Sequence, residues 1–332
     1  GRDPGVAPYS SYVHFIAAAA ILLTATFNYV GMRWGSLVQN ITTLAKTGAL
    51  VLIIILALAI GLPRTGGFYS PLVPPGSFST VPFGLALVSV LWVYDGWADV
   101  SFVGGEVKEP QKNLPKVLIF GTLIIIALYL FANLAYLAVL PVSEIRHSKL
   151  VAADVASAVM GPTGVVFVAG AVMVSTFGTL NGSTMTGGRI LFAMANDGLL
   201  FRPIGRVHPK FQTPSVAIAL SAGLGVLFVL AGTFERLADT FVTAIVPFYA
   251  LAVAAIYPLR RREGYQPAFR APGYPVIPMI FILATIFLLG AALIDSQSRG
   301  PTAAVLGVIL VGIPVYYFIV LPSAKRDSAT GE

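Results

Sequence analysis

Apolar residues along the chain gather into nine long segments separated by shorter polar stretches. Most segments hold about 18 to 25 residues, enough for an α-helix to cross the hydrocarbon core of a bilayer. A membrane β-barrel would alternate apolar and polar residues, whereas runs such as GALVLIIILALAIGL do not alternate. The pattern therefore predicts an all-α membrane protein with nine transmembrane helices. The predicted spans are residues 12–30, 36–61, 82–106, 116–140, 163–196, 214–232, 237–259, 275–294 and 302–321.

Composition supports the same fold class. The chain of 332 residues is 57% hydrophobic and 11% charged, with a mean hydropathy of +0.85. These values lie well outside the range of soluble domains. We expect a single membrane domain over residues 1–332, and we predict no metal and no cofactor.

The basic residues are distributed unevenly between the two faces that alternating loops define. Fourteen Lys and Arg residues fall on one face and six on the other, and Lys46 lies within a span. Because cytoplasmic loops carry an excess of Lys and Arg, the first face is predicted to be cytoplasmic, with the C-terminus on it. The net charge of +7 then reflects membrane orientation. No nucleic-acid partner is predicted, since no basic run is interleaved with stacking aromatics.

The same topology predicts that residue 1 lies outside the cell. The chain opens with GRDPGVAPYSSYV, which has no initiator Met, basic leader or short hydrophobic region. We therefore expect an odd number of spans upstream of residue 1, and we interpret residues 1–11 as the rest of an external loop. The chain contains no cysteine, so no disulfide-linked subunit is expected through this part of the protein.

The predicted span 82–106 is unusually polar, with two aspartates and a glutamate in VLWVYDGWADVSFVGGEV. Ionisable residues inside a bilayer are costly unless they face a cavity or a partner. Gly96 tolerates non-helical dihedrals, so we expect a break, with the first half-helix ending near residues 92–94. Asp95 would cap the second half-helix and Asp99 would lie in its first turn. The alternative is a kinked helix whose polar residues pack against neighbouring helices.

Lys46 is a second candidate, because it lies about ten residues, or roughly 15 Å, into its span. It can replace a sodium ion by bridging backbone carbonyls, or it can extend its long side chain to the membrane surface. The span 163–196 is rich in small and hydroxyl residues, which permit close helix packing and can also face a polar cavity. Spacing alone favours packing for most of them. The candidates for cavity lining are Ser175, Thr176 and Thr179.

Three stretches carry a resemblance to a known family. YDGWADVSFVGGEVKEPQKNLPKVLI resembles the sixth-helix signature of the amino acid-polyamine-organocation (APC) superfamily, close to its L-type amino acid transporter branch and bacterial relatives. NYVGMRWGSLVQNITTLAKTGALVLIII resembles the fourth and fifth helices of that family. GTLNGSTMTGGRILFAMANDGLLFRPIGRVHPKFQTPSVA resembles its eighth helix and the loop that follows. The resemblance covers residues 12–321, and the spans would correspond to helices four to twelve.

The resemblance implies an inverted-repeat transporter fold of five plus five helices with two more at the end, here without its first three helices. Residues 12–61 would be the last two helices of the first repeat, 82–259 the second repeat, and 275–321 the two C-terminal helices. Substrate would lie between two broken helices, of which the family's first helix has no counterpart in this chain. The chain alone is therefore expected to bind substrate weakly or not at all. A bacterial inner membrane is the implied location.

The resemblance also implies substrate-binding residues in the broken helix. The backbone of Trp92, Val93 and Tyr94 would meet the substrate amine, and Trp92 would be the aromatic gate. Gly96 and Trp97 complete this segment.

Two further residues match positions with a role in the family. Lys46 matches the fifth-helix lysine that stands in for a sodium ion in sodium-independent members. Asp95 could pair with a cationic side chain, because broad-specificity carriers of dibasic and neutral amino acids share the W-x-Y-D-G-W pattern. Asp95 could equally be a helix cap.

The predicted function is sodium-independent secondary transport of neutral and/or cationic L-amino acids, by exchange or proton coupling. The alternatives are a polyamine or other organic-amine permease, or an inactive truncated fragment. A channel or an intramembrane enzyme is a more distant alternative. An aspartyl protease would need a Gly-x-Gly-Asp tetrapeptide, which does not occur, and the three histidines lie in or near predicted loops.

Overall fold

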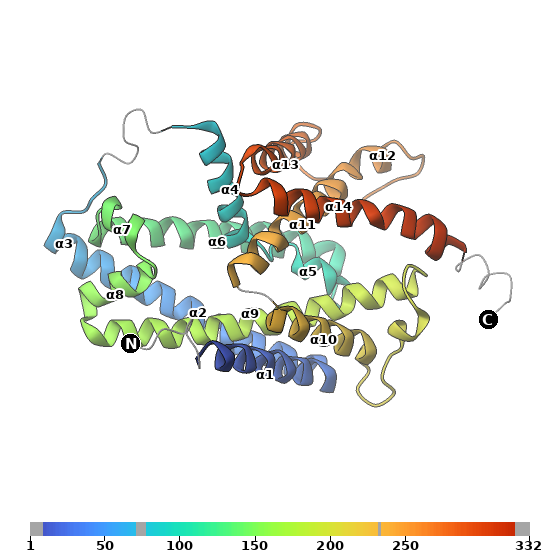
Figure 1. Cartoon of the computed structure of the whole chain (residues 1–332), viewed down its shortest axis with the longest axis horizontal. Coiled ribbons are helices and arrows are strands. Elements are labelled where there is room, and N and C mark those ends of the chain that lie inside the picture. Colours follow the sequence, from blue (N-terminus) through green and yellow to red (C-terminus); the bar gives the residue numbers. More distant parts are fainter. Residues whose placement is uncertain (1–8, 71–77, 232–233, 323–332) are drawn as a thin grey trace. The chain divides into compact units, whose positions relative to one another are not determined.

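The computed structural model describes residues 9–70, 78–231 and 234–322 (Figure 1). Within these ranges all regular structure is helical, which confirms the predicted all-α class. Residues 1–8 of the predicted external loop lie outside the described residues, and residues 9–11 already belong to the first helix. The helices are α1 (Tyr9–Val30), α2 (Met32–Leu56), α3 (Leu62–Thr65), α4 (Thr80–Tyr94), α5 (Asp99–Phe102), α6 (Pro110–Val139), α7 (Val142–His147), α8 (Val151–Met160), α9 (Pro162–Asn196), α10 (Ser215–Ala231), α11 (Phe234–Ala254), α12 (Ile256–Arg260), α13 (Val276–Ile294) and α14 (Arg299–Val315).

Seven helical segments in the described part of the chain are long and apolar enough to cross a membrane. The predicted spans 82–106 and 214–232 are not among them, because α4 has 15 residues and α10 has 17. The count of nine spans is therefore not confirmed and stays a prediction. The seven segments are Tyr12–Val30, Met32–Thr65, Pro110–Val139, Pro162–Asn196, Phe241–Arg260, Val276–Ile294 and Arg299–Phe318.

The outer faces of the long helices are apolar, as expected of helices surrounded by lipid. On α6, Phe120 is 62% exposed and Ile124 is 59% exposed, whereas Ala135 and Ala138 nearer its C-terminal end are fully buried. Large apolar residues are thus exposed along α6, and small ones are buried where it packs against other helices. This arrangement suits a bilayer, where close packing of small residues, and not burial of large ones, holds helices together.

The chain divides into two compact units. The first comprises Gly1–Ser77, Lys116–Ile190 and Arg206–Gly223, and the second comprises Phe78–Pro115, Leu191–Gly205 and Leu224–Glu332. Neither unit is continuous in sequence, because α6, α9 and α10 each contribute residues to both. The predicted division into repeats at residues 12–61, 82–259 and 275–321 stays a prediction.

The core of the first unit is built largely from alanine and valine. It joins α2 and the π-helix Ala57–Gly61 that follows to α6, α8 and α9. Small side chains let these helices approach closely. The buried core residues are Ile53, Ile54, Ala57, Ala132, Ala135, Ala138, Val139, Ala153, Val155, Ala156 and Val168.

A second contact region in the first unit lies between α2 and α9. A Cβ atom added to Gly178 of α9 would collide with the side chain of Thr42 on α2. One turn further along α9, a Cβ at Gly182 would lie 3.3 Å from Gln39 Oε1. Glycines at these positions therefore let the two helices pack with little space between them.

The second unit packs α4, α11, α13 and α14 together. The contact between α4 and α13 is close, since a Cβ at Gly84 would lie 2.7 Å from the Cβ of Ala291. In this unit α4, α11 and α13 are mutual neighbours, and their sides that face one another carry the cavity described below.

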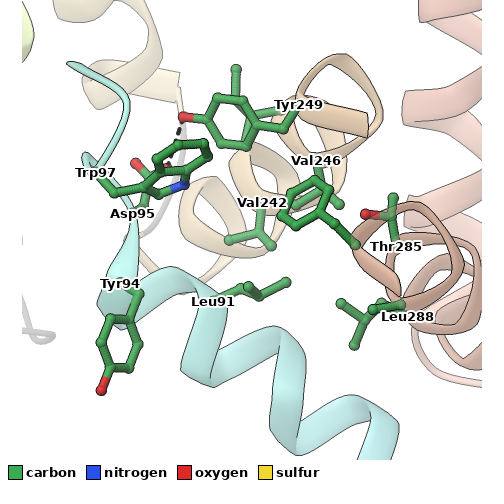
Figure 2. A pocket seen from close by; sticks show the side chains of 12 residues that line it. Leu91, Tyr94, Asp95, Trp97, Val242, Val246, Tyr249, Thr285 and Leu288 are labelled. Carbon is green, nitrogen blue, oxygen red and sulfur yellow. Dashed lines mark hydrogen bonds between the residues drawn. The ribbon is translucent and has the colours of Figure 1, made fainter. Parts of the chain in front are cut away.

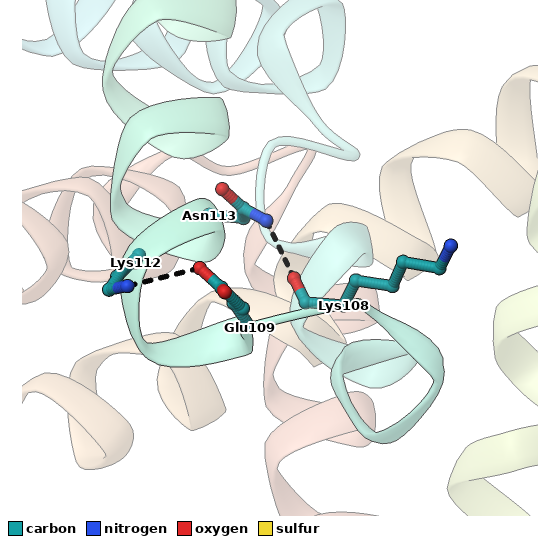
Figure 3. A network of polar contacts seen from close by, with 4 residues as sticks. All are labelled: Lys108, Glu109, Lys112 and Asn113. Atoms are coloured by element: carbon teal, nitrogen blue, oxygen red, sulfur yellow. Dashed lines mark hydrogen bonds and ion pairs between the residues drawn. The ribbon is translucent and has the colours of Figure 1, made fainter.

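A tight turn precedes α6 (Figure 3). Glu109 adopts a left-handed conformation with φ +44°, which non-glycine residues rarely adopt. The Asn113 side chain donates a hydrogen bond to the Lys108 carbonyl at 2.6 Å, and Lys112 forms an exposed ion pair with Glu109 at 3.2 Å. The exposed ion pair contributes little, so the turn is held mainly by the Asn113 side-chain bond and by the backbone amides of Lys112 and Asn113, which donate to the Glu109 carbonyl.

Candidate functional site

The helix that begins at Thr80 stops at Tyr94, in the middle of the predicted span 82–106. Asp95 is extended, with φ −63° and ψ 154°, and Gly96 has a φ of +92° that favours glycine. A new helical turn, α5, begins at Asp99. The predicted break is confirmed, including the end of its first half at residues 92–94 and the place of Asp99 in the first turn after it.

The predicted capping role of Asp95 is wrong. The residue that precedes α5 is Ala98, and α5 has no side-chain cap. The turn is closed by backbone bonds instead: the Asp95 amide donates to the Trp92 carbonyl at 3.2 Å, and the Asp99 amide donates to the Gly96 carbonyl at 3.1 Å. Asp95 lies too early in the turn to cap α5, so its carboxylate is available for a contact with another helix.

That contact is with Tyr249 on α11. The Tyr249 hydroxyl donates a hydrogen bond to Asp95 Oδ1 at 3.3 Å (Figure 2). The Tyr249 ring also packs against Trp97, with ring centroids 5.4 Å apart. The break in α4 is thus attached to α11 through both its carboxylate and its indole.

A cavity of about 130 Å³ lies beside the break, between α4, α11 and α13. Its wall is mainly apolar, and the polar side chains that line it include Asp95, Tyr249 and Thr285 (Figure 2). With about 30 Å³ per water molecule, this space is of the order of four waters, which fits an amino acid side chain better than a large ligand. The lining residues are Leu91, Tyr94, Asp95, Trp97, Val242, Ile245, Val246, Tyr249, Phe281, Ala284, Thr285 and Leu288.

Only some of the predicted substrate-binding residues of the broken helix line this cavity. Tyr94, Asp95 and Trp97 line it, although the Tyr94 ring points away from the other labelled side chains in Figure 2. Trp92 and Val93 do not line it. The Trp92 ring packs edge-on against Phe241 of α11, at 5.7 Å between centroids, and remains 38% exposed.

Tyr249 and Thr285 were not predicted as site residues. Each is a single hydroxyl in an otherwise apolar stretch, IVPFYALAV for Tyr249 and IFILATIFLL for Thr285. The sequence offered one signal that could have identified them: an isolated polar atom in a predicted membrane span needs a hydrogen-bond partner or a cavity. Nothing in the sequence indicates that these two hydroxyls and Asp95 border one cavity.

Lys46 belongs to the first unit, where it lies half-buried on α2. Along the contact between α2 and α9, rising residue numbers on α2 meet falling numbers on α9: Gln39 lies opposite Gly182, and Thr42 opposite Gly178. One further turn brings Lys46 to the level of Ser175, since residues three or four apart share a helix face. This register brings two of the predicted candidates to the same level of one helix contact.

The other two hydroxyl candidates on α9 bond to their own helix. Thr176 Oγ1 donates to the Val172 carbonyl at 2.6 Å, and Thr179 Oγ1 donates to the Ser175 carbonyl at 3.0 Å. Both threonines are exposed. Their hydroxyls already have partners within α9, so a cavity-lining role is left without support from these contacts and stays a prediction.

Comparison with known proteins decides the family. The sequence profile of the family described as "Amino acid permease" matches residues 3–322. The chain belongs to the amino acid permease family. The predicted membership of the APC superfamily is confirmed, and so is the prediction of a transporter family, not an enzyme family, whose members are multi-pass membrane proteins.

Several curated relatives of this permease are known. The serine/threonine exchanger SteT of Bacillus subtilis is 32% identical over 91% of this chain and 68% of its own length. The b(0,+)-type amino acid transporter 1 of Homo sapiens is 30% identical over 95% of this chain and 64% of its own length. The large neutral amino acids transporter small subunit 2 of Homo sapiens is 29% identical over 95% of this chain and 58% of its own length. The chain thus spans about two thirds of the length of such relatives or less.

Proposed function

We propose that this permease carries neutral and/or cationic L-amino acids across a membrane by alternating access, with the break in α4 as part of its substrate site. The observation that carries the proposal is the break itself: it interrupts an apolar segment, holds the carboxylate of Asp95 and borders a cavity of about 130 Å³. Discontinuous membrane helices that line a cavity are the usual binding sites of transporters with inverted repeats.

The chemistry of the break suits an amine. The C-terminal end of a helix carries a partial negative charge of about half a unit, and α4 ends at Tyr94, directly before the carboxylate of Asp95. A substrate ammonium beside this turn would therefore meet two negative groups. Trp92 and Val93, in the last turn of α4, and Gly96 and Trp97, in the turn after it, complete the proposed binding segment. Trp92 is proposed as the aromatic gate.

A cationic side chain is a second possible partner for Asp95. The Asp95 carboxylate interacts with the Tyr249 hydroxyl and with the Gly96 backbone amide, but its two oxygens offer about four acceptor sites, so a substrate guanidinium or ammonium can still bind it. The b(0,+)-type relative is named an amino acid transporter and SteT a serine/threonine exchanger. Both names fit an amino acid as the substrate class, and neither decides between neutral and cationic side chains for this chain.

Lys46 is proposed to supply a fixed positive charge where a sodium-coupled carrier would bind sodium. Support comes from its position at the level of Ser175 in the contact between α2 and α9, well inside the span Met32–Thr65. A lysine ammonium at that depth needs carbonyl or hydroxyl acceptors. Transport is accordingly proposed to be independent of sodium and to proceed by exchange or by proton coupling.

The arrangement in the membrane is proposed from the charges. Fourteen of the 21 basic residues fall on the face assigned to the cytoplasm, which supports a cytoplasmic C-terminus. A bacterial inner membrane is proposed because the relative SteT is a protein of Bacillus subtilis. Residues 12–61, 82–259 and 275–321 are proposed as parts of the two repeats and the C-terminal helix pair. No disulfide to a partner subunit is proposed through this part of the protein, since residues 1–332 contain no cysteine.

The test is competition uptake. The complete reading frame that contains this chain is reconstituted in liposomes, and uptake of one labelled amino acid is competed with a panel of amino acids and with polyamines. Saturable uptake that amino acids compete for supports the proposal. Competition by polyamines alone would move the substrate class to organic amines, and the absence of saturable uptake, compared with protein-free liposomes, would overturn the proposal.

A further inference from the structure

Thr285 of α13 places a hydroxyl group in the wall of the cavity. The residue is only 4% exposed and lines the cavity together with apolar side chains. In Figure 2 its oxygen is turned toward the side chains across the cavity. Its hydroxyl forms no hydrogen bond with another described residue, and since it is not one of the fully buried polar atoms that lack a partner, its oxygen is accessible from the cavity.

A helical threonine ordinarily avoids this situation, because its hydroxyl can donate to the carbonyl of the preceding turn. Other threonines of this chain do so: Thr42 donates to the Val38 carbonyl at 2.8 Å, and Thr184 donates to the Leu180 carbonyl at 2.8 Å. Thr285 does not form this bond, although it is about as buried as those two threonines. A hydroxyl that opens onto the cavity and forms no bond within the protein can instead bind a polar group supplied from the cavity.

We propose that the Thr285 hydroxyl is a polar subsite that binds the neutral hydroxyl or carboxamide at the end of a substrate side chain. The inference rests on the proposed amino acid transport and names the side-chain class that the cavity accepts. In this arrangement Asp95 and the end of α4 hold the amine, and Thr285 contacts the far end of the side chain. α13 is thereby part of the substrate site.

The intervening wall sets the shape of this side chain. Leu91, Val242 and Val246 lie between the Asp95 end and the Thr285 end in Figure 2, so they suit an aliphatic stem. A hydroxyl both donates and accepts, which matches a carboxamide or a hydroxyl. A second ammonium at this end would meet no carboxylate among the described lining residues other than Asp95, so a neutral polar end is favoured there. Glutamine fits this description, and norleucine has a similar length without the polar end.

The test compares Thr285→Val, which removes the hydroxyl and keeps the branched shape, with Thr285→Ser, which keeps the hydroxyl. The purified protein from the complete reading frame is titrated with glutamine and with norleucine, and binding is followed by ligand-induced thermal stabilisation. Thr285→Val should weaken glutamine binding about three- to tenfold and leave norleucine within twofold, the range of one hydrogen bond. Thr285→Ser should stay within twofold for both ligands.

A matched control is Thr302→Val on α14, which changes another threonine that is 4% exposed and does not line the cavity. It should leave the ratio of glutamine to norleucine affinity unchanged. Equal losses for both ligands in Thr285→Val would overturn the proposal. If Thr285→Val does not fold, Thr285→Ala takes its place in the same comparison. A wild-type protein that does not bind glutamine more tightly than norleucine also overturns the proposal.

Binding and transport are separate readouts here. Selective glutamine binding without uptake in liposomes would contradict the proposed transport function and leave the Thr285 subsite standing. Uptake of amino acids without any preference for a neutral polar end would contradict the subsite alone.

Discussion

Asn28 on α1 donates a hydrogen bond from Nδ2 to Oδ1 of Asn181 on α9, at 3.0 Å. Asn181 in turn donates from its own Nδ2 to the Gly35 carbonyl at 2.9 Å and to Gln39 Oε1 at 3.1 Å. One buried side chain therefore joins α1, α2 and α9. Because α2 also carries Lys46, this network ties the helix of the lysine to α1 and α9.

Asn181→Ala should destabilise the first unit. The change removes the three interhelical hydrogen bonds of Asn181, which is fully buried. It also leaves a buried N–H of the Asn28 side chain without its acceptor on Asn181. Interhelical bonds in membranes average about 0.6 kcal/mol each, so the expected loss is about 2 kcal/mol. The measurement is the midpoint of thermal unfolding in detergent.

The control for this change is Asn133→Ala on α6, where an exposed asparagine bonds only to the Tyr129 carbonyl of its own helix. Its midpoint should shift by less than a third of the Asn181→Ala shift. Similar shifts for both variants would show that the interhelical network is not what stabilises this unit.

Two glycines of α9 should respond in opposite ways to replacement by alanine. At Gly178 a Cβ would collide with Thr42, so Gly178→Ala should cost about 1–3 kcal/mol by overpacking. At Gly170 a Cβ meets nothing within 4 Å, so Gly170→Ala should be neutral or stabilising, since alanine favours helix by up to about 1 kcal/mol. Thermal unfolding of both variants in the same detergent tests the contact. An equal loss in both would argue against close approach of α2 and α9 at Thr42.

The break in α4 could be predicted from the sequence because it is local: Asp95, Gly96 and Asp99 are polar or flexible residues within one apolar run. The role of Asp95 could not be predicted in the same way. Its partner Tyr249 is 154 residues away, and local spacing made helix capping the simpler interpretation. The Asn28–Asn181 bond, between residues 153 apart, was missed for the same reason.

The number of spans shows a different limit of sequence analysis. Hydropathy detects apolar segments, but the length of a helix depends on where its backbone turns. The predicted span 82–106 is apolar at its start and yet continues as helix only to Tyr94, where Gly96 redirects the chain. The predicted span 214–232 corresponds to α10, which begins at Ser215 and is described as far as Ala231, since residue 232 lies outside the described residues.

Lys46 gives a prediction about coupling. If its ammonium takes the place of a bound sodium ion, uptake into liposomes should be the same, within about twofold, when external sodium is replaced by choline. Lys46→Met keeps a long apolar side chain and removes the charge, so it should abolish most of the uptake if carbonyl groups at that depth need a cation. A matched charge change is Lys112→Met, an exposed lysine paired with Glu109, which should leave uptake nearly intact. A steep sodium dependence of the wild type would contradict this role of Lys46.

Asp95→Asn separates recognition of a cationic side chain from a purely structural role. The change keeps an oxygen that can accept the Tyr249 hydrogen bond but removes the negative charge, so the link between the break and α11 can persist. If Asp95 binds a cationic side chain, competition by arginine or lysine should weaken about 10- to 100-fold, the range of a charge-assisted hydrogen bond, while leucine loses much less. Asp295→Asn is the control, because this aspartate lies after α13 and binds backbone amides of Gln297 and Ser298 outside the cavity. Equal losses of competition by arginine and leucine in Asp95→Asn would instead indicate that the carboxylate binds the substrate amine, which both amino acids share. Tyr249→Phe would then be expected to change competition by both amino acids equally.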